Sequence, residues 1–254
     1  MAIFAKALRP KGKQVLFGAA LTVSFAGATV AGDLTTPVSD PVVVGPERYS
    51  DDVSAFYLGL NAGYGFGGTD RFGLRTGGGT FDIGNLKPSG AYGGIRGGWR
   101  GVVPATGGRD YVYGFELGYD FGSLEDTVSR QIGTTTVTGG SEISDVLSLK
   151  FRNGLTNKSG SVLYFVSFGL VQGEVATTNS TTSGGTTRAF EEKGRRNGLS
   201  ASIGAEHQLN DNWSITGEYE YVQFESKDVV FGSGFSTKST PKYSGLRVGL
   251  NYKF

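Results

Sequence analysis

The sequence predicts an all-β fold: a closed, eight-stranded, antiparallel up-and-down transmembrane barrel, preceded by a cleavable N-terminal signal helix. Apolar residues alternate with small or polar residues in eight stretches between residues 55 and 254, which is typical of half-buried strands. The connections between these stretches are alternately long and short. Glycine contributes 43 of the 254 residues, well above the usual share of about 7%.

The N-terminal part of the chain has the features of an export signal. Residues 1–31 are predicted to be a signal peptide, because four basic residues precede an apolar segment rich in small residues. A retained anchor helix is the alternative. Residues 32–54 contain three of the seven prolines and are predicted to be an extended periplasmic linker. Residues 55–254 then form the predicted barrel.

Charge and composition exclude several classes of protein. Removing the four basic residues of the signal peptide leaves 24 − 4 = 20 Lys and Arg against 23 Asp and Glu, about −3 overall. A strongly basic nucleic-acid-binding protein is therefore not expected. The chain has no cysteine and one histidine, which removes disulfides and makes a zinc site unexpected. No cofactor and no metal are predicted.

The first four stretches, residues 55–66, 89–100, 110–121 and 144–153, each have one apolar face. In the third, Phe115 and Leu117 alternate with Glu116; in the fourth, Leu147 and Leu149 follow the same alternation. We expect Leu147 to lie in the middle of the apolar belt. Because side chains of a strand point to opposite faces in turn, the charged residues share the other face.

The last four stretches cover residues 161–171, 197–209, 212–224 and 243–254. The fifth stretch is apolar on both faces, with the bulkier side chains at even positions. The other three alternate clearly, and the eighth ends on Phe254. Short connections follow the second, fourth and sixth stretches, and long ones follow the odd-numbered stretches. Short periplasmic turns opposite long outer loops are the layout of an outer-membrane barrel.

A soluble lipocalin-type barrel, with its apolar face inward, is the main alternative. The polar faces argue against it, because they hold Gly, Ser and few charges where a wetted exterior would carry many Lys and Glu. The aromatic residues also gather near two rims, as a bilayer favours. The inner rim is predicted to hold Phe56, Trp99, Tyr111, Tyr113, Phe151, Tyr164, Trp213, Tyr252 and Phe254.

The segments GLNAGYGFG, YGFELGYDFG and GLSASIGAEHQLNDNWSITGEYEYVQF, with an aromatic C-terminal strand, resemble a known family. These are the small eight-stranded outer-membrane barrels of Gram-negative bacteria, the opacity-protein-like "porin family" related to the OmpA transmembrane domain. The resemblance implies location in the cell outer membrane and contact with its lipid and lipopolysaccharide. It also implies a signal for the barrel-assembly machinery at Val248, Leu250, Tyr252 and Phe254. Reduced outer-membrane assembly on deletion of Phe254 would support that role.

We expect no catalysis from this chain. The run GYGFGG at residues 63–68 matches G-x-G-x-x-G, but no helix pattern follows it, as a dinucleotide site would need. Outer-membrane enzymes rely on a catalytic histidine. His207 has the parity of the lipid-facing residues and lies close to a short turn, so we expect an interfacial side chain without a catalytic partner.

The charged residues on the inner face are the most informative candidates for a functional site. Charges in a narrow lumen must be paired, because an unpaired buried charge costs several kcal/mol. A static plug of ion pairs is the favoured interpretation, and a narrow porin-like channel for ions or small solutes is the alternative. The predicted lumen charge network is Arg96, Glu116, Asp120, Lys150, Arg152, Glu206, Glu218, Glu220 and Arg247.

The long loops are expected to face outward. Residues 71–87 and 127–140 are predicted to extend the strands as hairpins, while the low-complexity segment 177–187 is expected to be mobile. The charged segment 188–196 is interpreted as a solvated loop end, with contact to lipopolysaccharide phosphates as the alternative. The sequence favours a structural or surface role in the envelope and leaves the oligomeric state open.

Overall fold

A computed structural model describes residues 54–231 and 234–254, which form twelve β-strands. The predicted signal peptide and all of the predicted linker before Ser54 lie outside the described residues. No helix among the described residues is long and apolar enough to cross a membrane.

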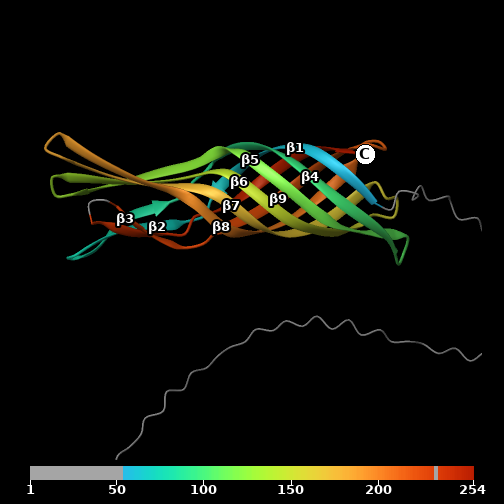
Figure 1. Cartoon of the computed structure of the whole chain (residues 1–254), viewed down its shortest axis with the longest axis horizontal. Coiled ribbons are helices and arrows are strands. Elements are labelled where there is room, and N and C mark those ends of the chain that lie inside the picture. Colours follow the sequence, from blue (N-terminus) through green and yellow to red (C-terminus); the bar gives the residue numbers. More distant parts are fainter. Residues whose placement is uncertain (1–53, 232–233) are drawn as a thin grey trace, which may run out of the picture. The chain divides into compact units, whose positions relative to one another are not determined.

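Eight strands form a ring in which every neighbouring pair is antiparallel (Figure 1). The ring closes because β1 pairs with β12 on one side and with β4 on the other, so that Leu60 lies opposite both Leu250 and Ile95. The all-β, antiparallel, eight-stranded prediction is confirmed. The ring strands are β1 (Ser54–Gly67), β4 (Gly90–Ala105), β5 (Arg109–Ile132), β6 (Thr135–Thr156), β7 (Val162–Ser183), β8 (Thr186–Gln208), β9 (Trp213–Phe224) and β12 (Lys242–Lys253).

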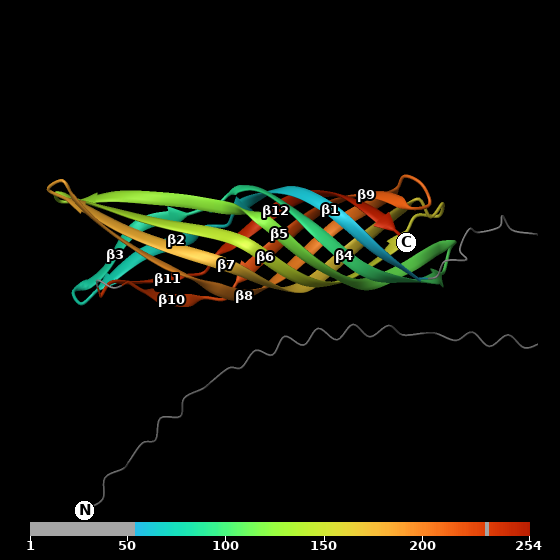
Figure 2. The same cartoon turned by 45° about the horizontal axis from the view of Figure 1, so that its top comes forward.

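A second sheet lies beyond the outer end of the barrel (Figure 2). Its strands pair in the order β10-β11-β2-β3. The hairpin predicted at residues 71–87 is confirmed as β2 and β3, whereas the β10–β11 hairpin was not predicted. The four strands are β2 (Asp70–Thr76), β3 (Gly79–Leu86), β10 (Lys227–Val230) and β11 (Ser236–Ser239).

The long strands β5 to β8 continue well past the barrel and correct two expectations. The segment 177–187, expected to be mobile, forms the paired tip of the β7–β8 hairpin, with Ser183 opposite Thr186. The segment 188–196 is likewise part of β8, not a loop end. Threonines suit strands because they are β-branched, and the register set within the barrel carries these residues into the same ladder. Low complexity alone was a misleading signal here.

The long strands bend at one level near the outer rim. The β5–β6 ladder skips between Asp120 and Ser123, and the β6–β7 ladder skips between Ser144 and Leu147. Asp145 has a φ of 50° and Gly122 a φ of 116° at this place. Bulges of this kind bend a strand and re-aim its side chains. They mark the level at which β5, β6 and β7 continue past the barrel.

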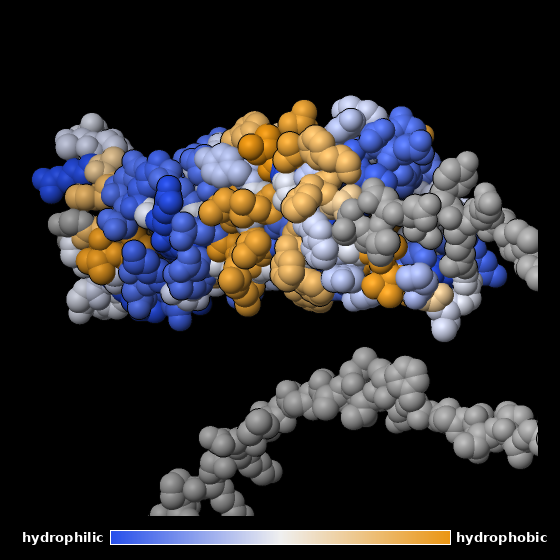
Figure 3. Space-filling model, turned by 45° about the vertical axis from the view of Figure 1, so that its right-hand side comes forward, coloured by the Kyte–Doolittle hydropathy of each residue, from blue (hydrophilic) through white to orange (hydrophobic). Residues whose placement is uncertain are grey.

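The predicted faces of the barrel strands are confirmed. Outward residues such as Phe56 and Leu60 are 68% and 64% exposed, whereas inward residues such as Tyr57 and Arg96 are buried. Figure 3 shows hydrophobic residues in a central band, with hydrophilic residues on either side. The apolar face of the barrel strands therefore points outward and the polar face points into the barrel. A lipocalin has the reverse arrangement.

Two residues lie at other depths than predicted. Leu147 pairs with Tyr119 and Gln172, so it lies close to the outer rim and not in the middle of the belt. Phe151 pairs with Phe115 and Phe168, so it lies above the inner rim. Both errors have one cause: neighbouring strands are staggered, and a strand's depth cannot be counted from its own ends alone.

The middle of the apolar belt is a site where a charge should be costly. Leu149 pairs with Leu117 and Leu170 and is 50% exposed on the outer face. We expect Leu149→Arg to lower the free energy of unfolding by about 2–4 kcal/mol, since Arg would enter hydrocarbon near the midplane. Reversible urea unfolding in lipid vesicles measures it. The control Thr136→Arg, exposed at the outer end of the same strand, should leave stability unchanged; a neutral Leu149→Arg would mean that this face does not meet lipid.

Candidate functional site

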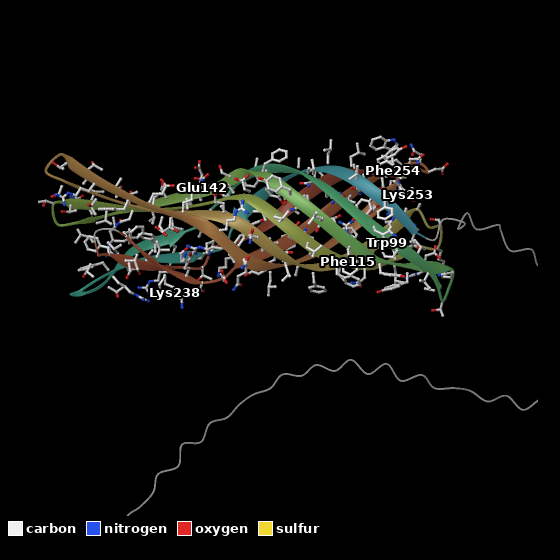
Figure 4. All side chains as sticks on the ribbon, in the orientation of Figure 1. Trp99, Phe115, Glu142, Lys238, Lys253 and Phe254 are labelled. Atoms are coloured by element: carbon white, nitrogen blue, oxygen red, sulfur yellow. The ribbon has the colours of Figure 1, made fainter. Side chains whose placement is uncertain are left out.

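The inward positions of six strands bring together the nine charged residues selected from the sequence. Each of the nine is at least 93% buried, with Lys150 and Glu220 only 1% exposed. They come from β4, β5, β6, β8, β9 and β12. In Figure 4, Trp99 and Phe254 lie toward one end of the barrel, and Glu142 and Lys238 lie toward the outer sheet. The buried charges belong to the barrel strands that run between these two ends.

The outer half of the charge cluster is centred on Glu220. Its carboxylate accepts Nη2 of Arg247 at 2.7 Å and Nζ of Lys150 at 2.7 Å. Arg247 also contacts Asp120 at 2.7 Å, and Lys150 contacts Glu218 at 3.4 Å. Each cation therefore faces two carboxylates, which offsets the cost of removing it from water.

The inner half is centred on Arg152. Its guanidinium lies 2.9 Å from Glu116 and 3.5 Å from Glu206. Glu206 is also bound by Arg100 at 2.8 Å, while Arg96 lies 3.9 Å from both Glu116 and Glu218. Counting Arg100, five cations meet five carboxylates, so the cluster is formally neutral.

Neutral polar side chains complete the cluster, and the sequence analysis did not select them. Tyr57 donates its hydroxyl to Glu116 at 2.8 Å, and Ser214 donates to Glu206 at 2.7 Å. Arg96 donates from Nε to Asn251 at 2.9 Å and also hydrogen-bonds Thr216. All these partners have the inward parity of their strands. Their position in the alternation could have assigned these side chains to the interior. It could not have selected them as partners of the charges, because many hydroxyl and amide side chains face inward and the sequence does not give their depth.

Two apolar layers lie inside the ring against the charges, and Leu163 of the inner layer is the cross-strand neighbour of Glu206. The inner layer is formed by Val112, Leu163 and Phe165, with Val102 packed against them. The Arg152 guanidinium lies over the Phe165 ring, 4.1 Å from its centroid. The outer layer consists of Tyr92, Leu124, Ile143, Val146, Val171, Val175, Val222, Phe224 and Tyr243.

The apolar layers explain the fifth stretch of the sequence. Its odd residues Leu163, Phe165 and Val171 are buried inside the ring and belong to the two layers. A strand with two apolar faces is therefore one that contributes both to the lipid face and to the packed interior. At the inner end, a cavity of only about 10 Å³ remains beside Arg100 and Glu206, about the smallest space that can hold one water.

Three residues of the predicted assembly signal share the outer face of β12, and the fourth, Phe254, directly follows that strand. Val248, Leu250, Tyr252 and Phe254 are all at least 36% exposed. The Tyr252 ring lies 5.2 Å from Phe254, and the Phe254 amide donates to the Phe56 carbonyl at 3.0 Å. These contacts place the four side chains on the lipid-facing surface where β12 meets β1.

His207 also faces outward. It pairs with Val162 and Ile215 in the ladders of β7 and β9, and its side chain is exposed. Within residues 54–231 and 234–254, no three His, Cys, Asp or Glu side chains are grouped to hold a metal ion.

A ring of eight antiparallel strands with an apolar outer band and a polar, packed interior defines an outer-membrane β-barrel protein. The sequence family described as the outer membrane protein beta-barrel domain matches residues 17–254. The chain belongs to this family, and the protein is located in the cell outer membrane.

The chain is also similar to individual proteins. It is 28% identical over 245 residues to the 31 kDa outer-membrane immunogenic proteins of Brucella melitensis and Brucella suis, covering 93% of this chain and 98% of each relative. Among solved structures, Neisserial surface protein A aligns with 12% identity and a TM-score of 0.37, covering 80% of this chain and 100% of that chain. The outer membrane protease OmpT from Escherichia coli aligns with 12% identity and a TM-score of 0.43, covering 79% and 96%.

Removing one member of the buried charge cluster should destabilise the barrel. We expect Lys150→Met to lower the free energy of unfolding by about 3–5 kcal/mol, because Glu218 and Glu220 would lose a buried counter-charge. Urea unfolding of the refolded barrel measures the effect. Lys193→Met is the matched control: Lys193 contacts Glu174 at 2.6 Å, but its side chain is 54% exposed, so stability should not change. Equal effects of the two substitutions would contradict a paired, water-poor interior.

Proposed function

We propose that this protein is a non-conducting, non-enzymatic barrel with a structural role in the outer membrane, whose lumen is filled by paired charges. One observation carries the proposal: the neutral charge cluster is packed against two apolar layers, and its most exposed member is Arg100 at the inner end, with 19% of its side chain exposed. An ion entering from either side would meet packed side chains such as Phe165 or Phe224, which are 2% and 1% exposed. It would have to displace them before it could pass from one end of the cluster to the other.

The alternative is a narrow porin-like channel for ions or small solutes. It would require the apolar layers to move and the ion pairs to exchange partners. The network offers shared carboxylates such as Glu218, which lies within 4.0 Å of Lys150, Arg152 and Arg96. A shared carboxylate could pass from one cation to another, as a gated ion path would need. The tight packing of both apolar layers favours the plug.

Single-channel recording in a planar bilayer separates the two. We expect the refolded barrel to be silent, and Glu116→Ala and Arg152→Ala to remain silent or to give only unstable openings. Each preparation is first shown to be folded by its shifted gel mobility without heating. Steady openings of the unmodified barrel, with a conductance that changes in these two variants, would refute the plug and establish the channel.

The absence of catalysis is part of the proposal. The chain has one histidine, and its side chain is exposed beside apolar neighbours on the outer face. The buried carboxylates are each engaged by cations, and each of their side chains is at most 7% exposed. Neither arrangement offers a substrate an acid, a base or a nucleophile that it could reach.

The surface role rests on the compact structure formed beyond the barrel, here termed the outer platform. It has its own core, formed by Phe72, Leu74, Ile83, Leu86, Val137, Val229 and Phe231.

Buried polar contacts also hold the outer platform together. Asp70 accepts the Thr240 amide at 2.8 Å, and burial raises the pKa of this carboxyl. The Arg196 guanidinium donates to the Ser239 carbonyl at 3.2 Å. A packed core and buried polar contacts favour a rigid surface over mobile loops. The word "immunogenic" in the relatives' names is consistent with display of this surface.

Surface display can be tested with single cysteines, because the chain has none. We expect Ser183→Cys, at the exposed tip of the β7–β8 hairpin, to react with a membrane-impermeant maleimide on intact cells. Thr106→Cys, exposed in the short β4–β5 turn, is the matched control and should react only after the outer membrane is permeabilised. The reverse pattern would mean that the barrel is inserted the other way round.

A further inference from the structure

A groove of about 650 Å³ runs across the lipid-facing surface of β5 to β9. One side of it is a row of cross-strand neighbours that pair successively through the sheet: Phe115, Phe151, Phe168, Ala201 and Tyr221. Ala201 is the one small side chain in this row. It leaves a notch between Phe168, which is 60% exposed, and Tyr221.

The other side of the groove is the next row toward the outer rim, formed by Leu149, Leu170, Leu199 and Gln223. Its leucines are 50–65% exposed. The inward-facing positions Gly169 and Ser200 also line the groove, so its floor is the backbone of β7 and β8. The walls are apolar over most of their length and end at an amide.

The direction and length of the groove match a lipid chain in one leaflet. Five strands at about 4.8 Å spacing span about 19 Å. Because barrel strands tilt by about 40°, the row rises by about 12 Å, close to the half-thickness of about 15 Å of the hydrocarbon core. Phe115 lies midway along the membrane part of β5, and Gln223 lies next to the outer end of β9. The groove therefore runs from the bilayer centre to the outer rim.

The outer end of the groove is polar, and further polar side chains of β7 and β8, Arg195 among them, lie beyond it. Tyr221 donates its hydroxyl to Gln223 at 2.9 Å, and Gln172 donates to Asn197 at 3.0 Å. Arg195 lies 3.5 Å from the Gln172 side chain. The carboxylate opposite Arg195 in the ladder, Glu174, is already bound by Lys193 at 2.6 Å. Among the described residues Arg195 forms no ion pair, so its guanidinium is available to an anion.

We propose that this groove is a specific binding site for lipopolysaccharide, the acylated and phosphorylated glycolipid of the outer leaflet. One acyl chain lies in the notch over Ala201, and the amides of Gln172, Asn197 and Gln223 face the sugars. Arg195 binds a phosphate, which a guanidinium can contact with two hydrogen bonds. The site lies on the outside of the barrel and is independent of whether the lumen conducts.

The test fills the notch without touching the interior. Unmodified protein, Ala201→Phe and Ala205→Phe are purified from outer membranes in mild detergent, and bound lipopolysaccharide is counted by native mass spectrometry. Ala205 is the matched control, because it also faces outward on β8 but does not line the groove, and it lies opposite Gly217, where space is open. Gel mobility without heating confirms that all three are folded.

We expect about one lipopolysaccharide to remain on the unmodified barrel and on Ala205→Phe, and at least a tenfold loss on Ala201→Phe. Arg195→Gln should weaken retention several-fold, whereas phospholipid of matched chain length should fail to displace the bound molecule. Equal retention by Ala201→Phe, or an equal loss in Ala205→Phe, would overturn the site. Displacement by phospholipid would show a groove for any acyl chain and overturn its assignment to lipopolysaccharide.

Discussion

The structure depends on one constraint: within hydrocarbon, each backbone amide and carbonyl needs a partner in the protein. A sheet satisfies this only by closing, and β1 closes it by pairing with both β4 and β12. Closure with eight strands leaves an interior so narrow that side chains fill it. The crowded interior follows from that strand number, whereas the apolar outer face follows from contact with the hydrocarbon.

The interior therefore holds charged side chains in a space with little water. Its ten charged groups balance in number, and shared carboxylates such as Glu220 join neighbouring cations into one cluster. Breaking such pairs is costly, whereas their net contribution over apolar packing is small. The apolar layers packed against the cluster limit the access of water to these pairs, and Arg100 is the most exposed member. Charge pairing and apolar packing thus support each other along the barrel axis.

Much of this was predictable from the sequence because strand parity is a robust signal. The alternation alone assigned Arg96, Glu116 and Lys150 to the interior and Phe56 to lipid. Depth was not predictable, since the stagger between strands is a property of the closed sheet; Leu147 and Phe151 were misplaced for that reason. The outer platform was only partly foreseen. Its core joins residues of several loops, such as Phe72 and Val229, and no local pattern reports such a contact.

The strands β5 to β8 cross the boundary between barrel and platform without a break in the chain of hydrogen-bonded neighbours, apart from the bulges at the rim. The platform is therefore not tethered by a flexible linker. A force applied at the Gly184 turn would pass along the strands β5 to β8 into the part of the barrel wall that lies in the membrane. Mechanically, the barrel and the platform therefore form one stiff element and not two flexibly joined parts.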